Sequence, residues 1–414
     1  IDEFKMEMDK IVPWVDLLLN APKSILGENG LSQEVKENFH RLMDSLNKDF
    51  SLRRILDDYH DILDNLSKVI LSLRRTKAPE KQSREITTWL KQLEIALGES
   101  HMAARKIANR CKKLIDRIEE IFHAMDFSAL YDEKKELFSI GYDIESEKLQ
   151  DVYYDLLASE ARQTSFVAIA KGDIPQKHWF KLARSLTLVG DSRSLLSWGG
   201  TMFEYLMPLL IMKNYKNTLW DETYQTVIKG QRQYGDQRHV PWGVSESAFY
   251  AFDLQLNYQY KAFGVPKLGL KTGLIKDIVV SPYSSIMALA VDPLGTMKNI
   301  EHLIAEGMGG DYGMYEAIDY TPERVPHKKK SMVVKTYMVH HQGMIFLALN
   351  NYLNNNIMQE RFHGIPMIKA TELLLQERIP QKEILIKDYN NDSEIKDIDA
   401  EKKAFQEIYA RHII

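Results

Sequence analysis

The chain has 414 residues, which at about 150 residues per domain suggests two or three domains. Its 54 Lys and Arg residues against 58 Asp and Glu residues leave a net charge of −4, which argues against a general nucleic-acid binder. A content of 44% hydrophobic and 27% charged residues excludes a disordered or collagen-like chain. The single cysteine, Cys111, excludes an intrachain disulfide and a zinc cluster. No apolar run reaches the roughly 18 residues that a membrane-spanning helix needs.

The N-terminal sequence, which begins Ile1-Asp2-Glu3, is charged and lacks both a signal-peptide core and an initiator methionine. We therefore expect the chain to be a piece of a longer protein.

Residues 1–126 are expected to form an N-terminal helical region. Apolar residues there alternate at three- and four-residue spacing, which lays a seam along one side of a helix. The two seams are Leu52, Ile55, Tyr59, Ile62, Leu66, Val69 and Leu73, and Ile107, Cys111, Leu114, Ile118, Ile121 and Met125. Pro79 breaks the chain between them, so we expect two long antiparallel helices, with Cys111 buried on its seam. The region is either a docking or dimerising arm or a spacer that packs on the next domain.

Residues 127–388 are richer in Gly, Trp, Tyr and Met, and helical stripes alternate there with glycine-rich aromatic loops. The expected helices are 147–171, 177–189, 200–213, 218–230, 245–262, 293–307 and 335–354. Short strands are expected only at 276–280 and 331–334. The pattern predicts an all-α domain, followed by a charged helical tail over residues 389–414. No phosphate-binding glycine loop, H-E-x-x-H motif or G-x-S-x-G motif is present, so neither a nucleotide nor a metal cofactor is expected.

Glu160 falls on the apolar stripe of the first of these helices, between Leu156 and Thr164. A carboxylate on an apolar face is costly, so its pKa should be raised, as in a general acid. The alternative is a structural glutamate held by Arg162.

Glu246 follows a Pro-Trp-Gly loop and is expected in the first turn of the helix 245–262, with Ser245 as the N-cap. The helix dipole and free backbone N–H groups would favour its ionised form there. The alternative is an ordinary glutamate at a helix start. A neutral and an ionised carboxyl together would suit the acid and the nucleophile of glycoside chemistry.

Several loops nearby carry aromatic and carboxylate side chains of the kind that line sugar sites. These candidates for substrate binding include Trp198, Glu204, Trp242, Tyr312 and Glu316. His340, His341 and Gln342 open the last predicted helix, and His341 lies on its apolar stripe. Adjacent histidines point about 100° apart, so they do not easily share a metal. His341 is either a core histidine or a hydrogen-bonding group for a sugar.

Five motifs, taken in order, resemble the glycoamylase-like middle domain of cyclic β-1,2-glucan synthases. They are Leu157–Arg162 (LASEAR), Ser197–Tyr205 (SWGGTMFEY), Trp242–Ser247 (WGVSES), Tyr312–Ala317 (YGMYEA) and Tyr337–Met344 (YMVHHQGM). The resemblance covers a little over half of the chain and leaves the N-terminal helical region without a match.

The resemblance implies an (α/α)6 barrel that closes linear β-1,2-glucan into a ring by anomer-retaining transglycosylation. It implies Glu246 as the nucleophile, Glu160 as the acid/base and Arg162 among the substrate-binding residues. No cofactor is implied. The implied partners are β-1,2-glucan and the other domains of a larger inner-membrane synthase, with this piece soluble on the cytoplasmic side. The alternatives are an inverting endo-β-1,2-glucanase, a phosphorylase and a non-catalytic glucan-binding module.

Overall fold

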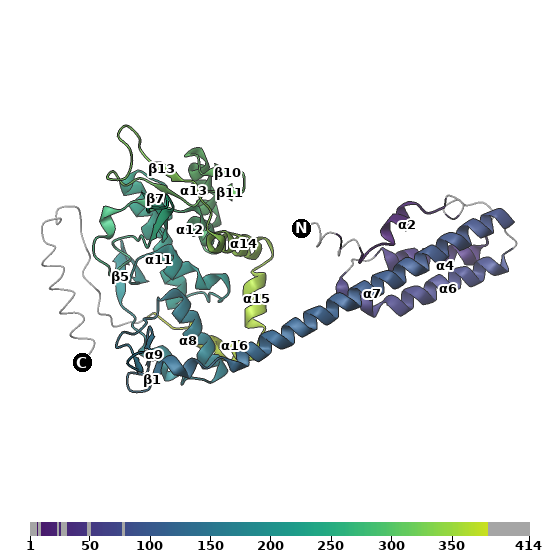
Figure 1. Ribbon diagram of the computed structural model, residues 1–414, viewed down its shortest axis with the longest axis horizontal. Coiled ribbons are helices and arrows are strands. Elements are labelled where there is room, and N and C mark those ends of the chain that lie inside the picture. The colour runs from purple at the N-terminus through teal and green to yellow at the C-terminus, as the bar shows by residue number, and fades with distance from the viewer. Residues whose placement is uncertain are drawn as a thin grey trace. The chain divides into compact units, whose positions relative to one another are not determined.

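The computed structural model describes residues 6, 10–22, 25, 31–47, 51–76 and 79–379 (Figure 1). The chain divides into two compact units, Ile1–Met125 and Asp126–Ile414. The expected tail over residues 389–414 lies outside the described residues. Among the described helices, none combines the length and the apolar character that crossing a bilayer requires.

The first unit is a helical bundle. Its helices are α2 (Val15–Leu19), α4 (Gln33–Leu46), α5 (Leu52–Asp57), α6 (Tyr59–Arg75) and α7 (Glu80–Ala124). Apolar side chains of α4, α6 and α7 bury one another at the three- and four-residue spacing of a helical seam. The first predicted seam is confirmed for Ile62, Leu66, Val69 and Leu73, although a helix boundary at Asp58 divides it.

The second seam differs from its prediction along the later part of α7. The helix buries Trp89, Leu93 and other apolar residues only as far as Ala104. Beyond that point Cys111 is exposed, and Leu114 and Ile118 are 65% and 58% exposed. The prediction that Cys111 is buried is therefore wrong, because the bundle covers α7 only along its first half.

The second unit is built around helices, as predicted. They are α8 (Ser159–Lys171), α9 (Lys177–Lys181), α10 (Met202–Leu206), α11 (Leu219–Arg238), α12 (Pro282–Met287), α13 (Pro293–Ala305), α14 (Val339–Leu353), α15 (Ile357–His363) and α16 (Pro366–Thr371). The predicted helix 147–171 begins only at Ser159, and the predicted helix 177–189 ends at Lys181. One apolar core joins α8, α10, α11, α12 and α14.

Short strands are more frequent than the two that the sequence predicted, although helices dominate the unit. Two-stranded hairpins pair β1 (Tyr131–Asp132) with β2 (Leu137–Phe138), β3 (Tyr142–Asp143) with β4 (Lys148–Leu149), β5 (Leu186–Val189) with β6 (Ser192–Leu195), β7 (Ser247–Phe252) with β8 (Tyr258–Lys261), and β10 (Gly309–Gly310) with β11 (Gly313–Met314). A three-stranded antiparallel sheet has the order β13-β12-β9, from Met332–Val334, Ala317–Asp319 and Val279–Val280. The predicted strand at 276–280 is confirmed only for Val279–Val280, and the one at 331–334 is confirmed for Met332–Val334.

The predicted helix over 245–262 is wrong. The segment forms a β-hairpin of β7 (Ser247–Phe252) and β8 (Tyr258–Lys261). Its turn is fixed by Asp253, whose Oδ1 accepts hydrogen bonds from the backbone N–H groups of Gln255 and Asn257. Aromatic residues dominate the two strands, which favours pairing over the helical stripe that their spacing also permits.

A partly buried ion cluster anchors this hairpin to the three-stranded sheet. Arg324 donates from Nε to Asp319 at 2.7 Å and from Nη1 to Asp277 at 2.5 Å. Its guanidinium carbon lies 4.8 Å from the ring centre of Phe249 on β7. The Asp319 side chain is fully buried, so its charge depends on this arginine.

Candidate active site

Glu246 ends a loop whose backbone is held from three sides. Gln231 on α11 clamps Val244, accepting from its N–H at 2.8 Å and donating to its carbonyl at 2.9 Å. Ser285 and Asn299 both donate to the carbonyl of Trp242. Such a loop presents the next side chain in one fixed position.

Tyr283 on α12 fixes Glu246 itself. Its hydroxyl donates to the Glu246 carbonyl at 2.9 Å and lies 2.8 Å from Ser245 Oγ. Ser245 Oγ also accepts from the N–H of Phe203 at 3.0 Å. The residue predicted as a helix N-cap is thus a buried link between the loop and α10.

The environment of the Glu246 carboxyl favours its neutral form. Burial raises the pKa of Glu246 to about 7, and the charges of Glu204 and Glu160 add to this shift. A hydrogen bond from Tyr260 opposes it. The expectation of an ionised Glu246 at a helix N-terminus is therefore wrong, because no helix begins there.

Glu160 lies in the first turn of α8 and is exposed. The prediction that it points into an apolar face is wrong, because its side chain is exposed to solvent. Its charge acts on both Glu246 and Tyr260, which places the two glutamates in one electrostatic site.

Arg162, by contrast, is 1% exposed and points into the core. Its guanidinium carbon lies 4.2 Å from the ring centre of Trp220, and its Nη2 donates to the Tyr205 carbonyl. It neither holds Glu160 nor presents a surface to a ligand, contrary to both predictions for it.

A chain of polar contacts leads from Glu246 into the protein. Tyr260 on β8 lies with its hydroxyl 3.4 Å from Glu246 Oε2 and 3.3 Å from His341 Nε2. His341 Nδ1 lies 2.8 Å from Glu316 Oε1. The structure thus brings Glu246, His341 and Glu316 together, as three of the predicted site residues.

Glu204 accepts hydrogen bonds from the neighbouring loop, residues 197–201. Its carboxylate accepts from the N–H groups of Gly199 and Thr201 and from Ser197 Oγ, and it completes a capping box at the start of α10. Burial raises the pKa of Glu204, while these donors lower it. Through these hydrogen bonds Glu204 stabilises the conformation of the loop, and its charge raises the pKa of Glu246.

The remaining predicted residues divide by exposure. Trp198 is 50% exposed, Tyr312 is 85% exposed, and His340 is exposed, so each can contact a ligand. Gln342 donates to the Met314 carbonyl at 3.2 Å and fixes the turn that follows Tyr312.

Trp242 is only 8% exposed and belongs to the core. The prediction that it presents an aromatic wall to a ligand is therefore wrong.

Sequence reasoning missed Tyr260 and Tyr283 as site residues. Tyr260 falls within the predicted helix 245–262, which does not form. Tyr283 stands in a Ser-Pro-Tyr-Ser-Ser run that gives no chemical signal by itself. Only the packing of α12 and β8 against the Glu246 loop reveals their positions.

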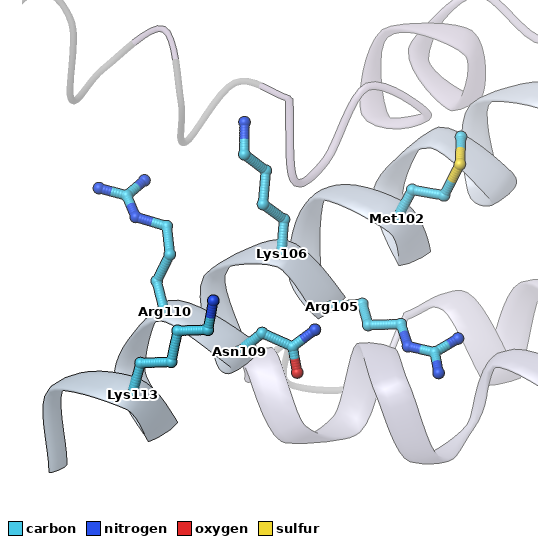
Figure 2. Close-up of a pocket in the computed structure, with 6 residues that line it drawn as sticks. All are labelled: Met102, Arg105, Lys106, Asn109, Arg110 and Lys113. Carbon is cyan, nitrogen blue, oxygen red and sulfur yellow. The ribbon is translucent and has the colours of Figure 1, made fainter. Parts of the chain in front are cut away.

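A surface pocket lies elsewhere, on α7, and Figure 2 shows its six lining side chains. They are Met102, Arg105, Lys106, Asn109, Arg110 and Lys113. All six come from one helix, so the pocket lacks the converging walls that a small-molecule site needs. Within the described ranges, no three His, Cys, Asp or Glu side chains are grouped so that they could hold a metal ion.

Known proteins resemble the chain in sequence. The Glycoamylase family model, described as "Putative glucoamylase", matches residues 152–366. Over 308 residues the chain is 44% identical to the cyclic beta-(1,2)-glucan synthase NdvB of Rhizobium meliloti (strain 1021), which aligns 72% of the chain with 11% of that protein. The chain therefore spans only about a tenth of this relative's length.

Two solved structures show a weaker likeness, and both are of endo-beta-1,2-glucanase from Talaromyces funiculosus. The complex with sophorose is 13% identical, with a TM-score of 0.41 and coverage of 79% of this chain and 67% of that one. A mutant in complex with beta-1,2-glucan is 11% identical, with a TM-score of 0.44 and coverage of 79% and 64%.

Proposed function

The chain belongs to the glycoamylase family, and from this premise we propose that its second unit is an anomer-retaining transglycosylase that closes linear β-1,2-glucan into a ring. The identity with a cyclic β-1,2-glucan synthase supports the substrate and the product. The observation that carries the chemistry is the placement of Glu246, whose backbone carbonyl is held by Tyr283 and whose carboxyl is influenced by the charge of Glu160.

In the proposed reaction, Glu246 attacks the anomeric carbon and forms a covalent glycosyl-enzyme. Glu160 donates a proton to the leaving glycosidic oxygen. Glu160, now a base, then takes the proton from the 2-hydroxyl at the non-reducing end of the same glucan, and that oxygen displaces Glu246. Each glycosidic bond broken is replaced by one formed, so no net hydrolysis occurs.

Water must be kept from the intermediate, since its attack would turn the transferase into a hydrolase. Trp198 and Tyr312 have exposed rings that could pack on the apolar faces of the glucose units. We further propose that the helices of this unit form an (α/α)6 barrel around the groove. The domain would work within a larger inner-membrane synthase, on its cytoplasmic side.

The test is incubation of the purified chain with linear β-1,2-glucan, with mass spectrometry of the products. We expect products lighter by one water than the linear glucans of equal length, and resistant to exo-acting enzymes. Shorter linear glucans would instead indicate an endo-glucanase, and the anomer of the new reducing end would then identify its mechanism. Turnover that depends on phosphate would indicate a phosphorylase. Binding without turnover would indicate a glucan-binding module.

Gly243→Ala should disable the site through the Glu246 loop. Gly243 has φ +122°, and a Cβ there would lie 2.3 Å from Ser285 Oγ and 2.8 Å from Ser284 Oγ. Both hydroxyls are held by hydrogen bonds to the same loop, so the loop itself must move. A displacement near 1 Å costs on the order of 100-fold in rate. Steady-state kcat on β-1,2-glucan measures this loss.

Gly172→Ala is the matched control. Gly172 follows α8 with φ +87°, and a Cβ added there would meet no atom within 4 Å. The variant should lower stability by about 1 kcal/mol through backbone strain alone and keep its kcat. Equal kcat losses in the two variants would contradict the role assigned to the Glu246 loop.

A further inference from the structure

One side chain, Tyr260, connects the Glu246 carboxyl to a buried histidine–glutamate pair. The Tyr260 hydroxyl lies within hydrogen-bonding reach of both Glu246 Oε2 and His341 Nε2, at 3.4 and 3.3 Å. These contacts are long for an O–H donor, as catalytic hydrogen bonds often are before substrate binds. His341 and Glu316 are closer, at 2.8 Å.

The His341–Glu316 pair is sealed from solvent. Each of the two side chains is 1% exposed. The Tyr283 ring stacks on the His341 ring, with centres 3.7 Å apart and planes 13° apart. Glu316 Oε1 also accepts from the N–H of Ala248 on β7, and its carbonyl accepts from Ser281 Oγ. A carboxylate and an imidazole held so firmly have a fixed geometry for exchanging a proton.

The proposed function requires an ionised Glu246, which the surroundings of Glu246 do not favour. A nucleophilic carboxylate must be ionised when it attacks. Burial and two nearby carboxylates favour the neutral form of Glu246 instead. The proton of Glu246 therefore needs an acceptor when the carboxylate attacks.

We propose that Tyr260, His341 and Glu316 form a proton relay that takes the proton from Glu246 and holds it on His341 while Glu246 attacks the sugar. This inference rests on the proposed function and assigns these three as positioning residues, which act through Glu246. It departs from the expectation that His341 and Glu316 bind substrate, since both are buried away from any ligand.

The proton transfer from Glu246 to His341 needs no further reactant. In the neutral resting state that we propose, Glu246 donates its O–H to the Tyr260 oxygen, Tyr260 donates to His341 Nε2, and His341 Nδ1–H donates to Glu316. Once Glu246 is ionised, the Tyr260 hydroxyl donates to it instead. Glu246 then passes its proton to Tyr260 as Tyr260 passes its own to His341. The products are a Glu246 carboxylate, an unchanged Tyr260 and an imidazolium paired with the Glu316 carboxylate.

The groups around the relay support this direction of transfer. Burial, followed by the charges of Glu246 and Glu316, raises the pKa of Tyr260 far above its usual value. Tyr260 therefore passes a proton on without becoming a tyrosinate. Burial raises the pKa of Tyr283 in the same way, so this stacked ring stays neutral.

His340, whose ring centre lies 4.0 Å from that of His341, has its pKa lowered by burial and then by the charge of His341. Its neutral form leaves His341 free to become the cation. The carboxylates of Glu160 and Glu204 act on the Glu246 end of the relay.

Tyr260→Phe and Glu316→Gln test the relay on the full chain with linear β-1,2-glucan. Tyr260→Phe removes the hydroxyl and keeps the ring, whereas Glu316→Gln removes the charge that stabilises the imidazolium. We expect kcat to fall by about 100-fold in each, the scale of one lost proton transfer, with KM within about threefold. The acidic limb of the kcat/KM profile, which reports ionisation of Glu246, should move to higher pH in both.

A second His–Glu pair in the same unit, in which only the histidine is fully buried, provides a control. His363 Nδ1 lies 2.8 Å from Glu372 Oε1, and His363 Nε2 accepts from the N–H of Lys213. Glu372→Gln should therefore lower stability without moving the pH profile. Glu316→Asp, which restores the charge, should recover part of the kcat lost in Glu316→Gln. A loss of stability alone in the relay variants, with wild-type kcat and pH profile, would overturn the relay.

A measurement without substrate separates this inference from the proposed function. Carbon-13 NMR of labelled glutamate follows the titration of the Glu246 carboxyl, which Glu246→Gln identifies by its absence. Tyr260→Phe should raise the pKa of Glu246, because the Tyr260 hydroxyl stabilises its ionised form. An unchanged titration would overturn the relay even if the chain cyclises glucan. A raised titration in a chain inactive on β-1,2-glucan would leave the relay standing and refute the proposed function.

Discussion

Replacement of either glutamate of the proposed pair, as Glu246→Gln or Glu160→Gln, should abolish ring closure of β-1,2-glucan. Each change keeps the size of the side chain and removes the ionisable group, so binding should persist while turnover falls by at least about 1,000-fold. Mass spectrometry of the products and calorimetric binding of linear glucan measure the two effects separately. Glu301→Gln on α13, an exposed glutamate outside the site, is the matched control and should retain full turnover.

Azide rescue distinguishes the roles of the two glutamates. In Glu246→Ala, azide can replace the nucleophile and should give an α-glycosyl azide, with inverted configuration. In Glu160→Ala, azide attacks the glycosyl-enzyme and should give the β-anomer. The opposite pattern would exchange the two roles. A carboxyl separation near 9 Å in a glucan complex would rule out the retaining mechanism, which requires about 5–5.5 Å.

Arg324→Met should produce the largest loss of stability outside the site. It leaves Asp319 buried without its ion pair and removes one of the two cations beside Asp277. An unpaired buried charge of this kind costs about 3–5 kcal/mol of unfolding free energy. Denaturant unfolding of wild type and variant measures the difference. The double variant Arg324→Met/Asp319→Asn should recover part of it, since it removes the buried charge as well.

The loss of stability in Arg324→Met should also depend on pH. Burial raises the pKa of Asp277, but hydrogen bonds from Arg324 and Lys261 more than offset it, so the pKa lies below its usual value. The stability that Arg324 confers through Asp277 is therefore present above the ordinary aspartate pKa and lost as pH falls through the lowered one. Lys229→Met removes an ion pair with the 93% exposed Asp191 and should cost less than about 1 kcal/mol at any pH. If Arg324→Met and Lys229→Met lowered the unfolding free energy equally, burial would not be what makes the Arg324 ion pairs important.

The sequence determined much of this protein because local patterns carry their own physical signal. The three- and four-residue spacing along Ile62, Leu66 and Val69 predicts a packed helix, and α6 buries these residues. The same spacing in Leu114 and Ile118 predicts the helix but not its partner, and both residues are exposed within the part of the chain that the structure describes. Helical periodicity is a property of one segment, whereas burial requires a second.

In the candidate active site, too, the sequence predicted some features and the tertiary structure decided the others. The motif around Glu246 identified the residue and its glycine-containing loop from the sequence alone. Its pairing and protonation were decided by the tertiary structure. The segment 245–262 carries both a helical stripe and strand-forming aromatics, and contact with β12, with Tyr250 N–H on Asp319, selects the hairpin.

That choice removes the helix dipole and brings Tyr260 to Glu246. The sign of the Glu246 pKa shift, the burial of Arg162 and Trp242, and the contact of His341 with Glu316 all depend on residues distant in the chain. Desolvation and charge coupling arise only when folding brings such residues together, so the sequence determined which groups are present and the tertiary structure determined their charge.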